Sequence, residues 1–204
     1  MKQMKIFTIL GILSLCSITA YSQTLKEKAE SGDKVAQYQY AQKISDRMFP
    51  SEEDLSEAVQ WLTKSALQGY APAQCNLGYC FDVGKGVKKD SFAAVNWYKK
   101  SANQGNMTAQ YNLGVCYAYG QGVPQSDYTA FSWYKKSAEQ GYAIAENALA
   151  KCYYYGTGTA TNNNLAYQWF VKAAEKKNVR AMFYLGECYN YGYGVQKNLK
   201  TAIE

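Results

Sequence analysis

The sequence predicts an all-helical protein, a right-handed solenoid of antiparallel helix pairs with a 36-residue period. Three observations lead to this fold class. A glycine-containing pentad recurs every 36 residues, apolar residues recur at helical spacing between its copies, and a polar residue suited to a helix N-terminus follows each copy at a fixed distance. The four pentads are VGKGV from Val83, YGQGV from Tyr119, YGTGT from Tyr155 and YGYGV from Tyr191.

The first 22 residues have the layout of a secretory signal peptide. Lys2 and Lys5 precede an apolar run that is too short for a convincing membrane span, and Ala20 and Ser22 are small residues suited to cleavage after Ser22. The alternative is a lipoprotein cut before Cys16, but Leu15 is larger than that processing prefers. We expect an exported protein, periplasmic or extracellular, with no stable membrane span once the signal is removed.

The unit from Ala71 to Gly105 illustrates the first helix of each pair. Ala73, Leu77 and Cys80 recur at helical spacing and form one apolar stripe. Gly84 should end this helix in the left-handed conformation, which costs glycine less than other residues. The glycine pentads are therefore interpreted as turns between helices.

The second helix should begin at Asp90, whose carboxylate can accept from free amides of the first turn. The residues at equivalent positions are Asp54, Ser126, Asn162 and Asn198. The helix then carries an apolar side and ends at Gly105. The residues of that side are Ala94, Trp97, Tyr98, Ser101 and Ala102.

A pair of short helices cannot bury its own apolar stripe, so successive pairs should stack into an array over residues 23–204. We expect a weak first unit at about 23–70 and an incomplete last unit at 179–204. Clear units are expected at about 71–106, 107–142 and 143–178.

The cysteines predict buried thiols rather than bridges or a metal site. The column Cys80, Cys116, Cys152 and Cys188 repeats every 36 residues. Stacked units place equivalent positions about 10 Å apart, beyond the roughly 7 Å alpha-carbon limit of a disulfide. Cys75 shares a helix with Cys80 but points away from it. The sequence has no CxxC motif, and we predict no metal site.

Charge and composition narrow the function classes. Lys2 and Lys5 belong to the leader, which leaves 20 basic and 16 acidic residues and a net charge of +4. This mild excess does not indicate nucleic-acid binding. Histidine is absent, which removes histidine-activated nucleophiles. The glycine pairs lack the lysine, hydroxyl or strand context of a nucleotide loop, so we predict no cofactor and no catalytic residue.

The segment AQYNLGVCYAYGQGVPQSDYTAFSWYKKSAEQG, residues 109–141, resembles a Sel1-like repeat, a variant of the tetratricopeptide helix pair. Its LGxxY, GxGV and AxxWYxKA motifs carry the resemblance over residues 58–202. The fourth unit departs from the pattern at Ala150, Thr159 and Lys177. The resemblance implies an exported bacterial scaffold that binds proteins and has no enzymatic activity.

By analogy with tetratricopeptide arrays, the first helices would line a concave surface that binds a protein or peptide. Two columns of candidate binding residues lie off the apolar stripe. One column is Asn76, Asn112 and Tyr184, and the other is Tyr119, Tyr155 and Tyr191. Their rings and amides suit contact with an extended backbone. The alternative for the second column is that its rings only pack between repeats.

Two other functions stay open. The lysine column Lys64, Lys100, Lys136 and Lys172 could meet an anionic cell-envelope polymer, although such a column is more often a solvated face. The S-x-x-K matches at Ser132 and Ser31 resemble those of β-lactam-recognising serine enzymes, but no K-T-G motif accompanies them.

The last segment, NLKTAIE, resembles the start of a second helix. The preceding helix carries Met182, Leu185, Cys188 and Tyr189, which a full partner helix would cover. We expect this end to self-associate, to bind a partner or to mark a truncated chain.

Overall fold

The computed structural model describes residues 24–203, and the signal-peptide prediction for residues 1–22 lies outside this range. Within it the protein is helical and has no strand, which confirms the all-helical repeat fold. Residues 24–30 form a short helix before the numbered elements. No helix in the described range is long and apolar enough to cross a membrane.

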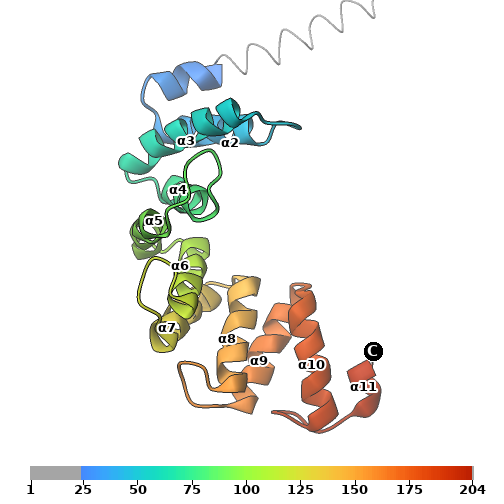
Figure 1. The fold of residues 1–204 in the computed structure, drawn as a ribbon. Coiled ribbons are helices and arrows are strands. Elements are labelled where there is room, and N and C mark those ends of the chain that lie inside the picture. The colour runs from blue at the N-terminus through green and yellow to red at the C-terminus, as the bar shows by residue number, and fades with distance from the viewer. Residues whose placement is uncertain (1–23, 204) are drawn as a thin grey trace, which may run out of the picture. The chain divides into compact units, whose positions relative to one another are not determined.

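The chain divides into two compact units, which meet in sequence at Lys89 and Asp90. The N-terminal unit contains α2 (Lys34–Ser45), α3 (Glu52–Leu67) and α4 (Ala71–Val83). The C-terminal unit contains α5 (Ser91–Asn103), α6 (Met107–Tyr119), α7 (Asp127–Glu139), α8 (Ala143–Tyr155), α9 (Asn163–Glu175), α10 (Val179–Tyr191) and α11 (Leu199–Ile203). Within each unit every helix packs against the next one, as α8, α9 and α10 show in Figure 1.

Polar caps begin the second helices, largely as the sequence predicts. The side chains of Asp90, Ser126 and Asn162 each accept from the backbone amide three residues later. The prediction for Asp54 is wrong. Helix α3 is longer than the other second helices, so it begins earlier, and Ser51 is its cap. Asp54 instead accepts from the Ser51 amide and completes a capping box.

The two glycines of each pentad have different structural tasks. Gly120, like its three equivalents, is a left-handed C-cap that ends a first helix. Gly122 also has a positive φ, but its backbone is pressed against the preceding second helix. A Cβ atom at Gly122 would overlap the backbone carbonyl of Ser91. Each equivalent glycine would likewise overlap a backbone carbonyl of the second helix before it. The pentads are therefore turns and inter-repeat contacts.

Small residues and leucines form the core where the helices approach. In the C-terminal unit Leu113 and Leu149 are fully buried, as are the alanines that precede them by four residues. One apolar cluster of this unit is centred on Tyr134 and Leu149, and another on Phe170 and Cys188. This packing leaves residues on the opposite side of the first helices, such as Tyr119 and Tyr155, exposed to solvent.

All five cysteines of the described residues are buried and free, as the sequence predicts. Burial raises the pKa of Cys75, Cys152 and Cys188 to about 11, and it raises the pKa of Cys80 as well. The folded protein therefore keeps these thiols protonated at a pH where an unfolded chain begins to ionise them.

We expect Cys75, Cys152 and Cys188 of the native protein to react about 100-fold more slowly with a thiol probe at pH 8 than in the denatured chain, since a two-unit rise in pKa lowers the thiolate fraction by that factor. Because the thiol pKa is higher in the folded than in the unfolded chain, the protonated thiols contribute fully to folding stability below pH 9. This contribution to the free energy of unfolding is lost as the pH rises through about 11. Probe kinetics with and without urea measure the first effect. Equal rates in both states would contradict buried thiols.

A ladder of buried glutamines joins neighbouring helix pairs. Gln110 donates to the carbonyl of Ala102 at 3.2 Å and accepts from Gln140 at 2.7 Å. Gln37 has equivalent partners in the N-terminal unit, with Gln68 as its donor. These bonds satisfy polar groups that the close packing would otherwise leave without water.

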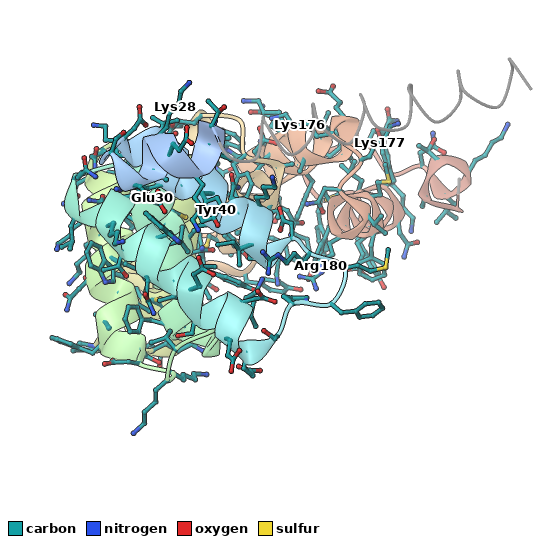
Figure 2. All side chains as sticks on the ribbon, turned by 90° about the horizontal axis from the view of Figure 1, so that it is seen from above. Lys28, Glu30, Tyr40, Lys176, Lys177 and Arg180 are labelled. Atoms are coloured by element: carbon teal, nitrogen blue, oxygen red, sulfur yellow. The ribbon has the colours of Figure 1, made fainter. Side chains whose placement is uncertain are left out.

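The fourth pair replaces this glutamine contact with an ion pair. Glu146 stands where Gln110 would recur, and its carboxylate accepts from Lys176 at 2.5 Å. Lys176 also donates to the Gly141 carbonyl at 2.8 Å. The next residue, Lys177, is the one non-glycine residue in the described range with a positive φ, at 62°. Figure 2 shows Lys176 and Lys177 near the turn between α9 and α10.

Candidate binding groove on the first helices

A groove of about 810 Å³ runs along the first helices of the C-terminal unit. Helices α6 and α8 and the start of α10 supply most of its walls. The wall residues used below are Tyr111, Tyr119, Tyr134, Asn147, Lys151, Tyr155 and Arg180. Among these residues Tyr119 and Tyr155 are exposed, whereas Tyr134 and Asn147 are buried.

Two exposed tyrosines stand on the rim of this groove. Tyr119 is 72% exposed and Tyr155 is 55% exposed. The Tyr155 hydroxyl lies 3.3 Å from the Tyr184 hydroxyl, and this hydrogen bond raises the pKa of Tyr155. Tyr184 in turn stacks on Phe170 with ring centroids 4.9 Å apart. The Tyr155 ring is thus held in place while more than half of it remains accessible.

The floor of the groove contains a buried polar group without a partner. Asn147 is 7% exposed, and its Oδ1 atom accepts no hydrogen bond within the described residues. Tyr134 lines the same groove and is also buried. An unpartnered buried acceptor costs free energy in the empty protein, so this atom is available to a ligand that brings an N–H or O–H donor.

The groove carries positive charge. Lys151 and Arg180 line it, and none of its described lining residues is a carboxylate. Lys151 lies 5.8 Å from the centre of the Tyr184 ring, which sets it on the α10 side. Burial raises the pKa of Tyr111, while the nearby Arg180 guanidinium opposes this rise. Arg180, labelled in Figure 2, is the second residue of α10.

Nearby carboxylates are turned to other partners. Glu146 is paired with Lys176, and Glu187 lies 3.4 Å from the Tyr154 hydroxyl. Neither lines the groove. The two groove cations are therefore not matched by an acidic group on the groove surface.

The structure brings only some members of each predicted column to the groove. Tyr119 and Tyr155 line the groove, and Tyr184 joins them through its bond to Tyr155. Tyr191 is exposed and stacks on Tyr193, outside the groove. Asn112 is half-buried on α6 and is not a lining residue. In the N-terminal unit, Asn76 donates to the Tyr38 hydroxyl at 3.4 Å.

Sequence reasoning did not identify Asn147, Lys151 and Arg180 because it looked for residue types that recur at one repeat position. Each of these three residues has a different residue type at the equivalent positions of the other units. A search for cations in a single unit, beside the tyrosine column, would have found Lys151.

The lysine column on the second helices has a local role. Each lysine lies over the ring of the tryptophan three residues before it, with distances to the ring centres of 3.8 to 4.2 Å. The pairs are Lys64 with Trp61, Lys100 with Trp97, Lys136 with Trp133 and Lys172 with Trp169. These cation–π contacts cover rings that are half-buried or, for Trp61, buried.

The serine-lysine matches have other partners. Lys135, which would activate Ser132, lies 3.9 Å from Glu139 as an exposed ion pair. The Ser31 hydroxyl donates to the carbonyl of Lys28. The geometry of the described residues therefore gives no support to serine activation at either match.

Comparison with known proteins adds a family to this geometry. The family model described as "Sel1 repeat" matches residues 34–70, 71–106, 108–142, 143–178 and 179–204. No curated protein matches the chain.

Solved structures show the same fold. A Sel1 repeat protein from Oxalobacter formigenes is 29% identical with a TM-score of 0.79, covering 88% of this chain and 52% of its own. A protective antigen present in uropathogenic Escherichia coli strains, displaying an SLR fold, is 28% identical with a TM-score of 0.70, covering 88% and 46%. The chain thus spans about half the length of these two relatives.

Proposed function

Because the chain belongs to the Sel1 repeat family, whose members generally mediate protein–protein interaction, we propose that it is an exported, non-catalytic scaffold that binds a peptide or protein segment in its first-helix groove. The observation that carries this proposal is the groove of about 810 Å³ with Tyr119 and Tyr155 exposed on its rim. The proposal of export rests on the signal-peptide pattern of residues 1–22.

The groove has the composition of a site for a polypeptide segment. Tyrosine rings supply contact area at low entropic cost, and their hydroxyls can bond a peptide backbone. The Tyr155 ring is already oriented by Tyr184, so less freedom is lost when a ligand binds. The alternative of a cell-envelope polymer on the lysine column is less favoured, because each lysine is held over a tryptophan.

We expect Tyr155→Ala to weaken the binding of peptides selected from a displayed random library by about tenfold, the cost of losing one aromatic anchor. Tyr128→Ala is the matched control, because Tyr128 is 75% exposed on α7 but does not line the groove. Fluorescence polarisation with a labelled peptide measures both variants. Equal losses in the two variants would exclude the groove as the binding site.

Self-association through α10 is a second, separate proposal. Val179, Met182 and Phe183 are exposed on this helix and form an apolar surface. We expect the sedimentation coefficient to rise with concentration, and we expect Phe183→Ser to suppress this rise. A coefficient that stays constant up to high concentration would exclude self-association.

A further inference from the structure

We propose that the groove selects an acidic segment, in which an Asp or Glu side chain lies between Lys151 and Arg180 while a backbone N–H donates to Oδ1 of Asn147. This inference rests on the proposed function and specifies its ligand. Three independent features of the groove support it: its charge, its unpartnered acceptor and its size.

The charge of the groove favours a carboxylate. Lys151 and Arg180 are its charged lining groups, and no described lining residue is acidic. The nearby Glu146 and Glu187 are engaged with Lys176 and with the Tyr154 hydroxyl. An acidic side chain placed here meets two cations and no acidic lining residue, and Arg180 can hold it with two parallel hydrogen bonds.

Asn147 indicates which group lies beside that carboxylate. Its Oδ1 atom is buried and accepts nothing, so its ligand partner must be a donor. A backbone N–H of an extended chain is such a donor. The same chain can place its ring-sized or aliphatic side chains against Tyr119 and Tyr155.

The size of the groove favours an internal acidic residue over a chain end. A volume of about 810 Å³ lies in the upper part of the range for ligand sites and exceeds what one terminal residue needs. The tyrosines extend the contact surface beyond the two cations. We therefore infer that the bound carboxylate belongs to an Asp or Glu side chain inside the segment and not to its C-terminus.

The experiment begins with a library of random heptapeptides whose ends are both blocked, selected on the full chain. Peptides that depend on the groove should be enriched in Asp or Glu at one position. The best peptide and its amide analogue, with Gln for Glu or Asn for Asp, are then compared by fluorescence polarisation. We expect the acidic peptide to bind at least tenfold tighter at low salt.

The variant K151Q/R180Q should remove this acid-to-amide difference, while Lys136→Gln, an exposed lysine outside the groove, should leave it unchanged. If the double variant retains the difference, the inference is wrong. If enriched peptides lose binding in Tyr155→Ala but show no acidic preference, the proposed function stands and this inference falls. If no peptide depends on the groove, both fall.

The variant Asn147→Leu distinguishes a binding role of Asn147 from a role in supporting the fold. Removing an unpartnered buried acceptor should keep or raise the melting temperature of the empty protein, yet weaken the acidic peptide and its amide analogue by a similar factor. A lowered melting temperature with unchanged peptide affinity would show that Asn147 only supports the fold. A parallel library of peptides with free C-termini tests whether the bound carboxylate is that of a chain end. A preference for such peptides would overturn the inference of an internal Asp or Glu side chain.

Discussion

Replacement of Gly122 by alanine is expected to lower the free energy of unfolding by about 2 to 5 kcal/mol, the sum of a positive-φ cost and an overpacking cost. Gly122 has a φ of 70°, and a Cβ atom there would overlap the backbone carbonyl of Ser91. Backbone atoms cannot rotate away as a side chain can, so α5 or the turn must move.

Gly120→Ala is the matched control for this prediction. Gly120 also has a positive φ, at 67°, but its nearest neighbour to an added Cβ is the Gln125 side chain at 3.4 Å, an ordinary contact. We expect a loss of about 1 to 2 kcal/mol there, from conformation alone. Urea denaturation followed by circular dichroism measures both variants. Similar losses in the two would contradict a separate contact role for Gly122.

The comparison of these glycines shows which parts of the fold the sequence predicts. The 36-residue period and the left-handed caps follow from local chemistry, since glycine favours a positive φ wherever it occurs. The contact between Gly122 and Ser91 joins residues 31 positions apart in the chain. Such a contact depends on how neighbouring helix pairs stack, which local propensities do not determine.

The incorrect cap at Asp54 has a related cause. Counting back one period from Asp90 gives Asp54, but α3 has 16 residues where α5 has 13. The additional turn extends the helix toward its N-terminus, so Ser51 caps it. Periodicity predicts the position of a repeat well and the ends of a helix of atypical length poorly.

The candidate groove was predictable only in part. Tyr119 and Tyr155 stood out because tyrosine recurs at their position, whereas Asn147 and Arg180 each occur in one unit. The groove forms where α6, α8 and α10 meet, and its charge comes from residues that break the repeat pattern. Binding properties of repeat proteins reside in such departures, because the recurring residues are used for stacking.

The ion pair of Glu146 and Lys176 is another departure, and it leads to the second large expected effect. We expect Lys176→Ala to lower the free energy of unfolding by about 2 to 3 kcal/mol, because it leaves a buried carboxylate without its cation. The Glu146 side chain is 3% exposed. The value lies at or below the usual range for a broken buried pair, since the Lys176 side chain is 42% exposed and solvent can screen the site.

The matched control restores the glutamine contact of the other repeats. In the variant Glu146→Gln with Lys176→Gln, the two amides can bond as Gln110 and Gln140 do at 2.7 Å. We expect this variant to be within about 1 kcal/mol of the natural protein, since replacing a buried ion pair by a satisfied neutral one is often close to neutral. Glu146→Gln alone should cost little, because the exposed lysine can turn to solvent.

Comparing these three variants with the natural chain separates the effect of the buried charge on stability from the effect of packing. Urea unfolding of each gives the cost of the single changes and of the pair. If charge burial causes the loss, Lys176→Ala is the least stable of the set and the double glutamine variant recovers most of the difference. If the double variant were as unstable as Lys176→Ala, the loss would instead come from the Lys176 bond to the Gly141 carbonyl, which both variants remove. The ion pair would then be an incidental consequence of a turn that needs a long donor at this position.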